Sequence, residues 1–240
     1  MELYTINELS KSYVRWNIRS RKKSEICVLK KLNLTINNNE FICIIGKSGV
    51  GKTTLLKMLG GIEKPSAGSI LYTDMELYKC PETKMEEYRR KEIGFIFQDY
   101  KLLDELTVQE NILIPQILDG VKREAAESKM DKITELFGIN DKKNFYTYEL
   151  SGGEKQRAAI CRALINNPKV ILADEPTGNL DSVNTELILK VLLQIKVELK
   201  KTIIMVTHDE EICKYADRVI KMENDQIKEI FCPDFSTNYD

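Results

Sequence analysis

The sequence has no apolar run long enough to span a membrane. Its longest apolar stretches, such as residues 41–45 and 170–173, are far shorter than the roughly 18 residues that a spanning helix needs. The first residues also lack the basic end and apolar centre of a secretion signal. We therefore expect the protein to remain in the cytosol and not to cross a membrane by itself.

An excess of charge and a paired-cysteine motif are missing as well. The 36 basic and 37 acidic residues give a formal net charge of −1. No overall field attracts nucleic acid, and we expect no such partner. Six cysteines occur without any C-x-x-C pair, which argues against a zinc site or a redox motif. We expect reduced thiols, with Cys43 and Cys161 acting as small hydrophobes.

The sequence does contain a repeated alternation of short β-branched runs and helical segments. With 240 residues and 42% hydrophobic content, it is long enough to bury a sizeable core. The alternation predicts an α/β fold with a mainly parallel sheet covered by helices, with core strands at residues 41–45, 170–173 and 202–206. An alternating pattern at 32–36 indicates an antiparallel side sheet, built from residues 2–9, 28–36 and 68–72.

Between residues 98 and 166 the pattern is helical and predicts an inserted lobe. Thr-x-x-Glu signatures at Thr83 and Thr107 predict capping boxes, and Pro115 is expected to kink or end the helix that Thr107 opens. Further helices are predicted over 122–137, capped by Gly138, and over 185–199, packed against the sheet. We expect one domain over 1–240, with its core at about 1–97 and 167–228, its lobe at 98–166 and a loose tail at 229–240.

A Gly-x-x-x-x-Gly-Lys-Thr loop directly follows the first core strand. In such a loop, backbone N–H groups converge on phosphate oxygens beside the positive end of the next helix. Lys52 is placed to reach the β and γ phosphates, and Thr53 to offer its hydroxyl to Mg²⁺. The alternative, an ordinary glycine turn, is disfavoured by the preceding strand. The predicted phosphate-binding residues are Gly46, Lys47, Ser48, Gly49, Val50, Gly51, Lys52, Thr53 and Thr54.

Asp174 and Glu175 end another core strand, where packing needs no charge. Adjacent side chains on a strand point to opposite sides, so the two carboxylates are expected to have different roles. Asp174 is placed to hold Mg²⁺, usually through water, and Glu175 to polarise the attacking water as a general base. A solvated strand end is the alternative.

Ser151-Gly152-Gly153-Glu154 opens a helix predicted over residues 155–165. A capping box accounts for Ser151 and Glu154. It does not account for the two glycines, which weaken a helix start unless the backbone approaches something closely. An exposed helix start of this kind suits a γ-phosphate.

Together, the phosphate loop, the acidic strand end and Leu150-Ser151-Gly152-Gly153-Glu154 between them resemble the ATP-hydrolysing subunit of an ABC transporter. The resemblance covers residues 3 to about 227. It implies a P-loop NTPase of the ABC type with ATP and Mg²⁺ as ligands. It also implies that Ser151 to Glu154 complete the nucleotide site of a second copy, with two ATP molecules sandwiched in a head-to-tail dimer.

The resemblance assigns three further residues. Gln98, at the junction of core and lobe, matches a glutamine that binds Mg²⁺ and the attacking water; alone it would read as a surface residue. His208, the only histidine, matches a switch residue that contacts the γ-phosphate, although a lone histidine after a strand is usually structural. Asp181 matches a loop that crosses the dimer interface; helix capping before Val183 is a compatible role.

Tyr13 is the candidate for stacking on adenine, and Trp16 competes for that role. The segment over 14–25 is long and basic. We interpret it as a solvated loop, in preference to contact with anionic lipid headgroups.

Residues 98–103 and 107–115 resemble the lipoprotein-release, macrolide-efflux and antimicrobial-peptide-resistance branch of the family. This implies an amphipathic or peptide-like cargo, a separate transmembrane permease, and a peripheral location on the cytoplasmic face of the membrane. The motifs also permit a soluble ABC-type ATPase that acts as an assembly factor, like those that work on iron-sulfur scaffolds. The cargo and the direction of transport stay open.

Overall fold

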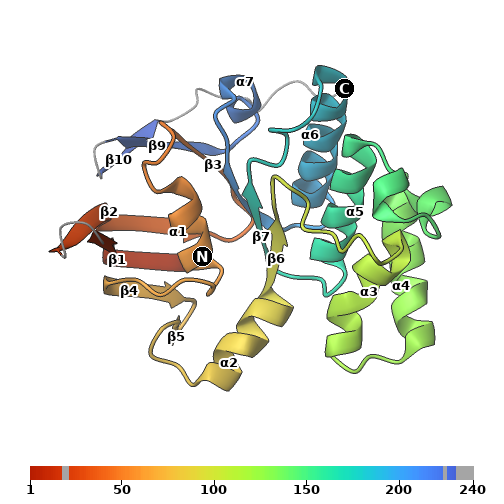
Figure 1. Ribbon diagram of the computed structural model, residues 1–240, viewed down its shortest axis with the longest axis horizontal. Coiled ribbons are helices and arrows are strands. Elements are labelled where there is room, and N and C mark those ends of the chain that lie inside the picture. The colour runs from red at the N-terminus through yellow and green to blue at the C-terminus, as the bar shows by residue number, and fades with distance from the viewer. Residues whose placement is uncertain (18–21, 224–225, 231–240) are drawn as a thin grey trace.

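Two β-sheets and their flanking helices form the part of the chain that the computed structural model describes, residues 1–17, 22–223 and 226–230 (Figure 1). The larger sheet has the strand order β10-β9-β3-β8-β7-β6. Its strands are β3 (Phe41–Gly46), β6 (Ile93–Ile96), β7 (Val170–Asp174), β8 (Thr202–Val206), β9 (Arg218–Glu223) and β10 (Gln226–Ile230). Neighbouring strands are parallel except β9 and β10. The predicted core strands and mainly parallel sheet are confirmed.

The central strands β3, β7 and β8 are apolar on both faces, and both faces are covered. In β3, Ile42 and Ile44 pack in one hydrophobic cluster with α1 (Lys52–Leu59) and the side sheet. Phe41 and Cys43, on the opposite face, pack in a second cluster with α5 (Gly152–Leu164) and α6 (Ser182–Val197). Burial from both sides explains the unbroken apolar run. It also confirms Cys43 as a buried hydrophobe, and Cys161 on α5 is buried too.

The smaller sheet is antiparallel, as predicted, with the order β2-β1-β4-β5. Its strands are β1 (Glu2–Asn17), β2 (Lys22–Asn37), β4 (Ala67–Tyr72) and β5 (Met75–Glu76). Figure 1 shows this sheet at one end of the molecule and the helical lobe at the other.

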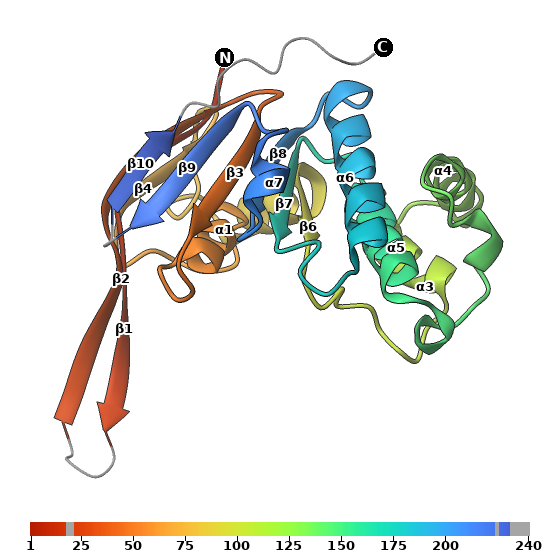
Figure 2. The same cartoon turned by 90° about the horizontal axis from the view of Figure 1, so that it is seen from above.

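The solvated loop expected over 14–25 is wrong for the described part of that segment. β1 and β2 stay paired beyond Tyr13, with Val14 opposite Glu25 and Trp16 opposite Lys23. β-branched and aromatic side chains favour extended backbone, and cross-strand hydrogen bonding is compatible with the basic charge. Figure 2 shows the resulting hairpin projecting from the body. Residues 18–21 lie outside the described residues.

The helical lobe contains α3 (Val108–Leu118), α4 (Arg123–Leu136) and α5, with 3-10 turns η2 (Asn140–Lys142) and η3 (Thr147–Glu149) before α5. The predicted capping box at α3 is confirmed, because the Thr107 hydroxyl accepts from the Glu110 amide at 3.4 Å and the Glu110 carboxylate accepts from the Thr107 amide at 2.8 Å. Gly138 follows α4 with φ 62°, the left-handed conformation of the predicted cap.

Of the two outcomes expected at Pro115, a kink or an end of the helix, the end is wrong, because α3 continues to Leu118 and the Asp119 amide donates to the Pro115 carbonyl at 3.2 Å. The kink stays a prediction. One missing N–H is tolerated where Val108 and Ile112 are fully buried. The capping box predicted at Thr83 is wrong, since α2 (Glu82–Glu87) has Pro81 as its N-cap and begins two residues earlier than that box requires.

The remaining elements are the π-helical turn η1 (Tyr88–Glu92) and α7 (Glu210–Cys213). The loose tail expected from residue 229 is wrong at its start, because β10 pairs with β9 as far as Ile230; residues 231–240 lie outside the described residues. Within the described ranges, no helix has both the length and the apolar character needed to cross a membrane.

Candidate functional site

The loop between β3 and α1 has a backbone that only glycine fits at two positions. Gly51 has φ 102°, and a Cβ there would lie 2.8 Å from Val28 Cγ1. A Cβ on Gly46 would lie 2.5 Å from the carbonyl oxygen of Met222. The sequence therefore forces a tight curve at the start of α1, where free helical amides and the helix dipole favour an anion.

Lys52 lies inside this curve. Its side chain is only 7% exposed, and Nζ donates to the carbonyl oxygens of Gly46 at 2.7 Å and Lys47 at 3.1 Å. The carbonyl oxygens of the loop thus hold an ammonium group at its centre. This arrangement suits the β and γ phosphates of a nucleotide.

Thr53 and Asp174 bring α1 and β7 together. The Thr53 hydroxyl donates to Asp174 Oδ1 at 2.9 Å. Burial raises the pKa of Asp174 above its ordinary value, and the neighbouring Glu175 charge adds to this effect, while the Thr53 hydrogen bond opposes it. Among the described residues, no three His, Cys, Asp or Glu side chains gather closely enough to hold a metal ion. A hydroxyl and one carboxylate fit Mg²⁺, which keeps several waters and takes phosphate oxygens as further ligands.

Glu175 has an unusual backbone conformation. Its φ is 45°, in the left-handed region that a non-glycine residue seldom adopts. The Glu175 amide donates to the Val206 carbonyl at 2.9 Å, which ties this turn to the end of β8. His208 follows β8, and its Nδ1 lies 3.2 Å from Glu175 Oε2. The predicted base and the predicted switch histidine are therefore in direct contact.

Gln98 is joined to the loop after β7 through Asn179, a residue that the sequence analysis did not single out. Asn179 Nδ2 donates to the Gln98 carbonyl at 3.0 Å, and Gln98 Nε2 donates to Asn179 Oδ1 at 3.5 Å. A Cβ on Gly178 would lie 2.9 Å from Gln98 Nε2. Asn179 lies two residues before Asp181, but the sequence around a single amide in a loop does not indicate which residue it will bind.

Asp181 caps α6, as the alternative interpretation predicted. Its Oδ1 accepts from the Asn184 amide at 2.8 Å. The Asn184 hydrogen bonds, first from its backbone and then from its side chain, hold the pKa of Asp181 below its ordinary value. The side chain is on the surface, so capping leaves it accessible to a second molecule.

Ser151 and Glu154 form the predicted capping box of α5. The Ser151 hydroxyl accepts from the Glu154 amide at 3.4 Å, and the Glu154 carboxylate accepts from the Ser151 amide at 2.8 Å and from its hydroxyl at 2.7 Å. These bonds hold the pKa of Glu154 below its ordinary value. The capped helix start is rigid and Ser151 is exposed.

Packing within the chain supplies a reason for Gly153 that the sequence analysis missed. A Cβ on Gly153 would lie 2.0 Å from Asn184 Oδ1 on α6, and one on Gly152 would lie 3.1 Å from the Tyr100 hydroxyl. The expectation that only a bound ligand explains these glycines is therefore too narrow. Asn184 is 31 positions away in the sequence, and no local pattern indicates this contact.

A pair of substitutions separates packing from ligand contact at Gly153. Gly153→Ala should lose about 1–3 kcal/mol of folding stability through overpacking, and adding Asn184→Ala should recover the thermal midpoint. If the backbone also approaches a phosphate, the stable double variant should still hydrolyse ATP at least roughly tenfold more slowly, equivalent to about 1.4 kcal/mol of barrier. Calorimetry and steady-state hydrolysis test this, with Asn184→Ala alone as control. Full recovery of hydrolysis would leave packing as the only role of Gly153.

All of these groups lie along one edge of the molecule. In Figure 2, the loop before α1, the loop after β7 and the segment that leads into α5 follow one another along the lower edge, with β7 in the middle. Ser151 and Glu154 bond to each other, and Glu154 also pairs with Lys142 of the lobe at 3.4 Å. One copy therefore presents a phosphate loop and a capped helix start as separate features of one face.

The comparisons with known proteins decide the family. The family model described as "ABC transporter" matches residues 29–178, more than half of the chain. This chain belongs to the ABC transporter ATPase family. The bacitracin export ATP-binding protein BceA of Halalkalibacterium halodurans is 45% identical over 200 residues, covering 83% of this chain and 79% of that protein. The lipoprotein-releasing system ATP-binding protein LolD of Bacteroides thetaiotaomicron is 42% identical over 201 residues, covering 84% and 92%.

A solved structure extends the likeness to three dimensions. The dimeric structure of a post-hydrolysis state of the ATP-binding cassette MJ0796, bound to ADP and Pi, superposes with a TM-score of 0.86. It is 32% identical in sequence and covers 97% of this chain and 100% of that one. The predicted family and fold class are confirmed: the chain is the ATP-binding subunit of an ABC transporter and an ATP hydrolase.

In this ATPase, Tyr13 lies closer to the phosphate loop than Trp16 does. The Tyr13 hydroxyl is 3.5 Å from Thr54 Oγ1 on α1, and Lys11 Nζ lies 5.0 Å from the centre of its ring. Partial burial raises the pKa of Tyr13. Trp16 is three residues farther along β1, and because strand side chains alternate, it occupies the opposite face of the hairpin.

The raised pKa of Asp174 predicts a stability cost in the nucleotide-free ATPase. A carboxyl whose folded pKa lies above its unfolded value destabilises the fold once it ionises, so the cost is present at neutral pH and disappears as the pH falls below the unfolded pKa. Asp174→Asn keeps an acceptor for Thr53, and its thermal midpoint at neutral pH should exceed that of the parent. The difference should vanish under acidic conditions. A midpoint below that of the parent at neutral pH would contradict the assignment.

Proposed function

We propose that two copies of this chain enclose two ATP molecules head to tail, each ATP lying between the phosphate loop of one copy and the start of α5 of the other. One observation carries the proposal: Ser151 is exposed at a capped helix start on the face that also bears the phosphate loop, and among the described residues its side chain bonds only to Glu154. Such a helix start offers amides to a γ-phosphate. The related cassette MJ0796, described as dimeric with ADP and Pi, supports the arrangement.

Within this site each residue has a separate task. Lys52 and the loop amides bind the phosphates. Thr53 and Asp174 would be ligands of Mg²⁺, and Gln98 would complete its coordination. Mg²⁺, when bound, neutralises phosphate charge during transfer. Glu175 accepts a proton from the attacking water, and His208, in contact with it, positions that water near the γ-phosphate. Tyr13 stacks on adenine, and Asp181 faces the second copy.

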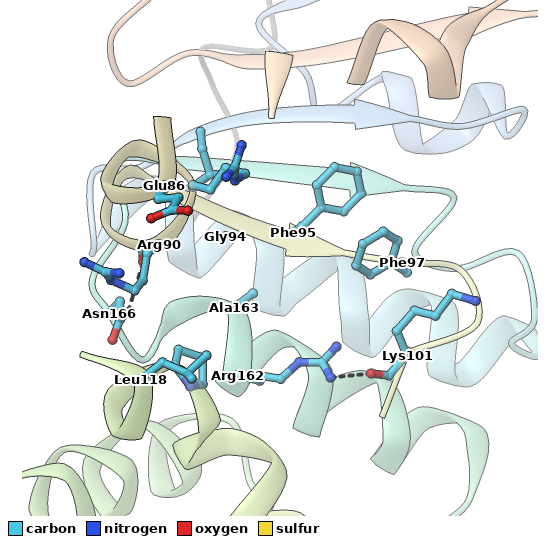
Figure 3. Close-up of a pocket in the computed structure, with 13 residues that line it drawn as sticks. Glu86, Arg90, Gly94, Phe95, Phe97, Lys101, Leu118, Arg162, Ala163 and Asn166 are labelled. Carbon is cyan, nitrogen blue, oxygen red and sulfur yellow. Dashed lines mark hydrogen bonds between the residues drawn. The ribbon is translucent and has the colours of Figure 1, made fainter. Parts of the chain in front are cut away.

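A groove between the core and the helical lobe is the proposed seat of the permease (Figure 3). It has a volume of about 490 Å³. Phe95 and Phe97 stack at 4.2 Å along one wall, and Leu118, 71% exposed, lies on the opposite side. An apolar segment of a membrane partner fits such a surface.

The groove is connected to the nucleotide site through Arg162. Its guanidinium donates to the carbonyl of Tyr100 at 2.7 Å and to that of Lys101. Arg162 belongs to α5, the helix whose start contacts ATP in the proposed dimer, and Tyr100 and Lys101 follow Gln98. A permease segment seated here therefore contacts both structures that respond to ATP. Closure and reopening of the dimer would be transmitted through this joint.

We further propose a position at the cytoplasmic face of the membrane, with contact to the bilayer through the permease. The cargo is a peptide, a lipoprotein or an amphipathic compound that is exported or extracted. The names of the relatives support this class, since one is a bacitracin export protein and another belongs to a lipoprotein-releasing system. These names favour transport over a soluble assembly factor.

Co-purification tests the proposal. A tagged chain, solubilised gently from its own cells, should retrieve a multi-span membrane protein. Leu118→Glu should reduce that yield severalfold, because it places a charge in the apolar groove. Val197→Glu, at a position 69% exposed near the end of α6, is the matched control and should retain the partner. Retrieval of a soluble scaffold and no membrane protein would overturn the transport proposal.

A further inference from the structure

The outer part of the β1–β2 hairpin has no role in the proposed nucleotide site. We call the paired residues 14–16 and 23–25, which lie beyond Tyr13, the hairpin extension. β4 pairs with β1 no farther than Ser10, so within the described residues the extension is a ribbon of two strands. Such a ribbon is marginally stable in water. It nevertheless exposes 68% of Val14 and 54% of Trp16, which lie on the same face of the ribbon. These side chains indicate a surface that another molecule covers.

A second exposed surface lies immediately before Ser151. We call Phe145, Tyr146 and Tyr148 the aromatic patch; they are 39%, 41% and 67% exposed. Tyr146 and Tyr148 stack at 5.5 Å with nearly parallel rings. Three exposed aromatic residues among four consecutive positions are uncommon on a monomer surface that contacts only water.

The two surfaces have complementary chemistry. The hairpin extension contains basic Arg15 and Lys23 and acidic Glu25. Within one copy, Lys142 Nζ lies 4.8 Å from the centre of the Phe145 ring, so the stacked rings of Tyr146 and Tyr148, with exposed Glu149 beside them, are the part of the patch available to a second molecule. Lysine and arginine bind the faces of aromatic rings, with a gain of about 0.5–1 kcal/mol at exposed sites. The apolar side chains of the extension add a hydrophobic contact to this pairing.

In the proposed dimer, the hairpin extension of one copy and the aromatic patch of the other lie at the same end of the interface. In both views the hairpin lies at one end of the molecule and the segment leading into α5 at the other, with the phosphate loop and β7 between them (Figures 1 and 2). In a two-fold dimer this order is reversed in the second copy, so each phosphate loop meets the partner's helix start. The hairpin extension of one copy then meets the aromatic patch of the other.

The length of the extension suits this contact. Tyr13 lies beside the phosphate loop, and Trp16 is about 10 Å farther along the strand at a rise of 3.3 Å per residue. Figure 2 shows the hairpin projecting past the edge that bears the phosphate loop. It therefore extends to the side on which the second copy lies in the proposed dimer.

We infer that the hairpin extension is a clasp that binds the aromatic patch of a second copy of this chain when ATP closes the dimer. This inference rests on the head-to-tail dimer proposed above and adds a contact outside the nucleotide. The clasp strengthens the closed state without touching the phosphates. A lipid surface is the competing partner for a basic, aromatic hairpin, and the direction of projection along the nucleotide face favours the second copy.

Shortening the hairpin tests the clasp. Residues 15–24 are deleted and Val14 is joined to Glu25 through Asn-Gly, which closes two paired positions with a two-residue turn. In a Glu175→Gln background with ATP, the dimer dissociation constant should rise at least roughly tenfold, about 1.4 kcal/mol. Tyr148→Ser should weaken the dimer in the same direction. Val197→Ser should not, and binding of a fluorescent ATP analogue to the monomer should stay unchanged in all three.

The outcomes separate this inference from the proposed function. If the Glu175→Gln parent forms no dimer with ATP, the shared-site proposal fails. If the parent dimerises and the shortened variant dimerises within twofold of it, only the clasp is wrong. Binding of the parent to phosphatidylglycerol vesicles, lost on shortening while the dimer is unaffected, would assign the hairpin to lipid and overturn the clasp.

Cross-linking tests the contact directly and does not depend on folding of the shortened chain. Trp16→Cys and Tyr148→Cys are combined in a background of Cys27→Ser, Cys232→Ser and Glu175→Gln. An intermolecular disulfide should form on mild oxidation with ATP, much less with ADP, and not with either introduced cysteine alone. An ATP-dependent dimer that does not cross-link would contradict the clasp.

Discussion

Glu175→Gln should abolish most hydrolysis and leave ATP binding intact. The amide has the size of the carboxylate but cannot accept a proton from water, and general-base catalysis contributes roughly 10²–10⁴-fold to rate. ATP that binds without being hydrolysed keeps the two copies closed, so a dimer should accumulate. Single-turnover hydrolysis and light scattering with ATP and Mg²⁺ measure the two effects.

Glu210→Gln is the matched control for this result. Glu210 is an exposed carboxylate at the start of α7, two residues after His208, and its replacement should leave the rate within about twofold. A Glu175→Gln chain that stays monomeric at high concentration with ATP would contradict the shared site. A chain with normal turnover would contradict the assignment of the base.

Lys52→Met should lower the affinity for ATP by roughly 10- to 100-fold, because hydrogen bonds to a charged group are worth about 1.5–3 kcal/mol. Methionine keeps the length of the apolar stem but loses the ammonium group. The substitution also removes two hydrogen bonds within the loop, because Lys52 Nζ donates to the carbonyls of Gly46 and Lys47. The measurement is therefore ATP affinity together with the thermal midpoint of the nucleotide-free chain.

Lys64→Met, at an exposed lysine outside the loop, is the control and should change neither quantity. Unchanged ATP affinity and turnover in the Lys52 variant would refute its role in phosphate binding. A lowered midpoint with unchanged affinity would show that the lysine only supports the loop.

The parts of the site that the sequence predicted are those whose physical cause is local. Gly51 and Lys52 lie in a short loop whose curvature depends on glycine, and the loop directly follows an apolar strand. The capping box of Ser151 and Glu154 is a bond between residues three apart. In each case the side chains that define the feature are neighbours in the sequence, so their spacing contains the geometry.

The parts that the sequence did not predict depend on distant pairing. Residues 14–17 and 22–25 were predicted as a loop because the basic charge of the segment is apparent from the sequence, whereas the pairing of these residues across two strands is not. Contact between Gly153 and Asn184 and the Gln98–Asn179 bonds join separate elements. At Thr83, a local signature was overridden by Pro81, which begins α2 by itself.

The second copy was predicted from the family resemblance alone, because neither the spacing of the motifs nor the structure of one copy indicates it. A single chain presents Lys52 and Ser151 on one face without joining them. The second copy that joins them is invisible to composition, periodicity and intrachain contacts. For this reason the most informative experiment combines two defective chains.

Complementation between a Lys52→Met chain and a Ser151→Arg chain tests the shared active centre most directly. Each chain alone lacks one half of both sites and should hydrolyse ATP very slowly. A mixed dimer contains one site made from the intact loop of one chain and the intact helix start of the other, so mixing should restore single-turnover hydrolysis. If the mixture hydrolyses ATP no faster than the two chains measured separately, the sites are not shared between copies.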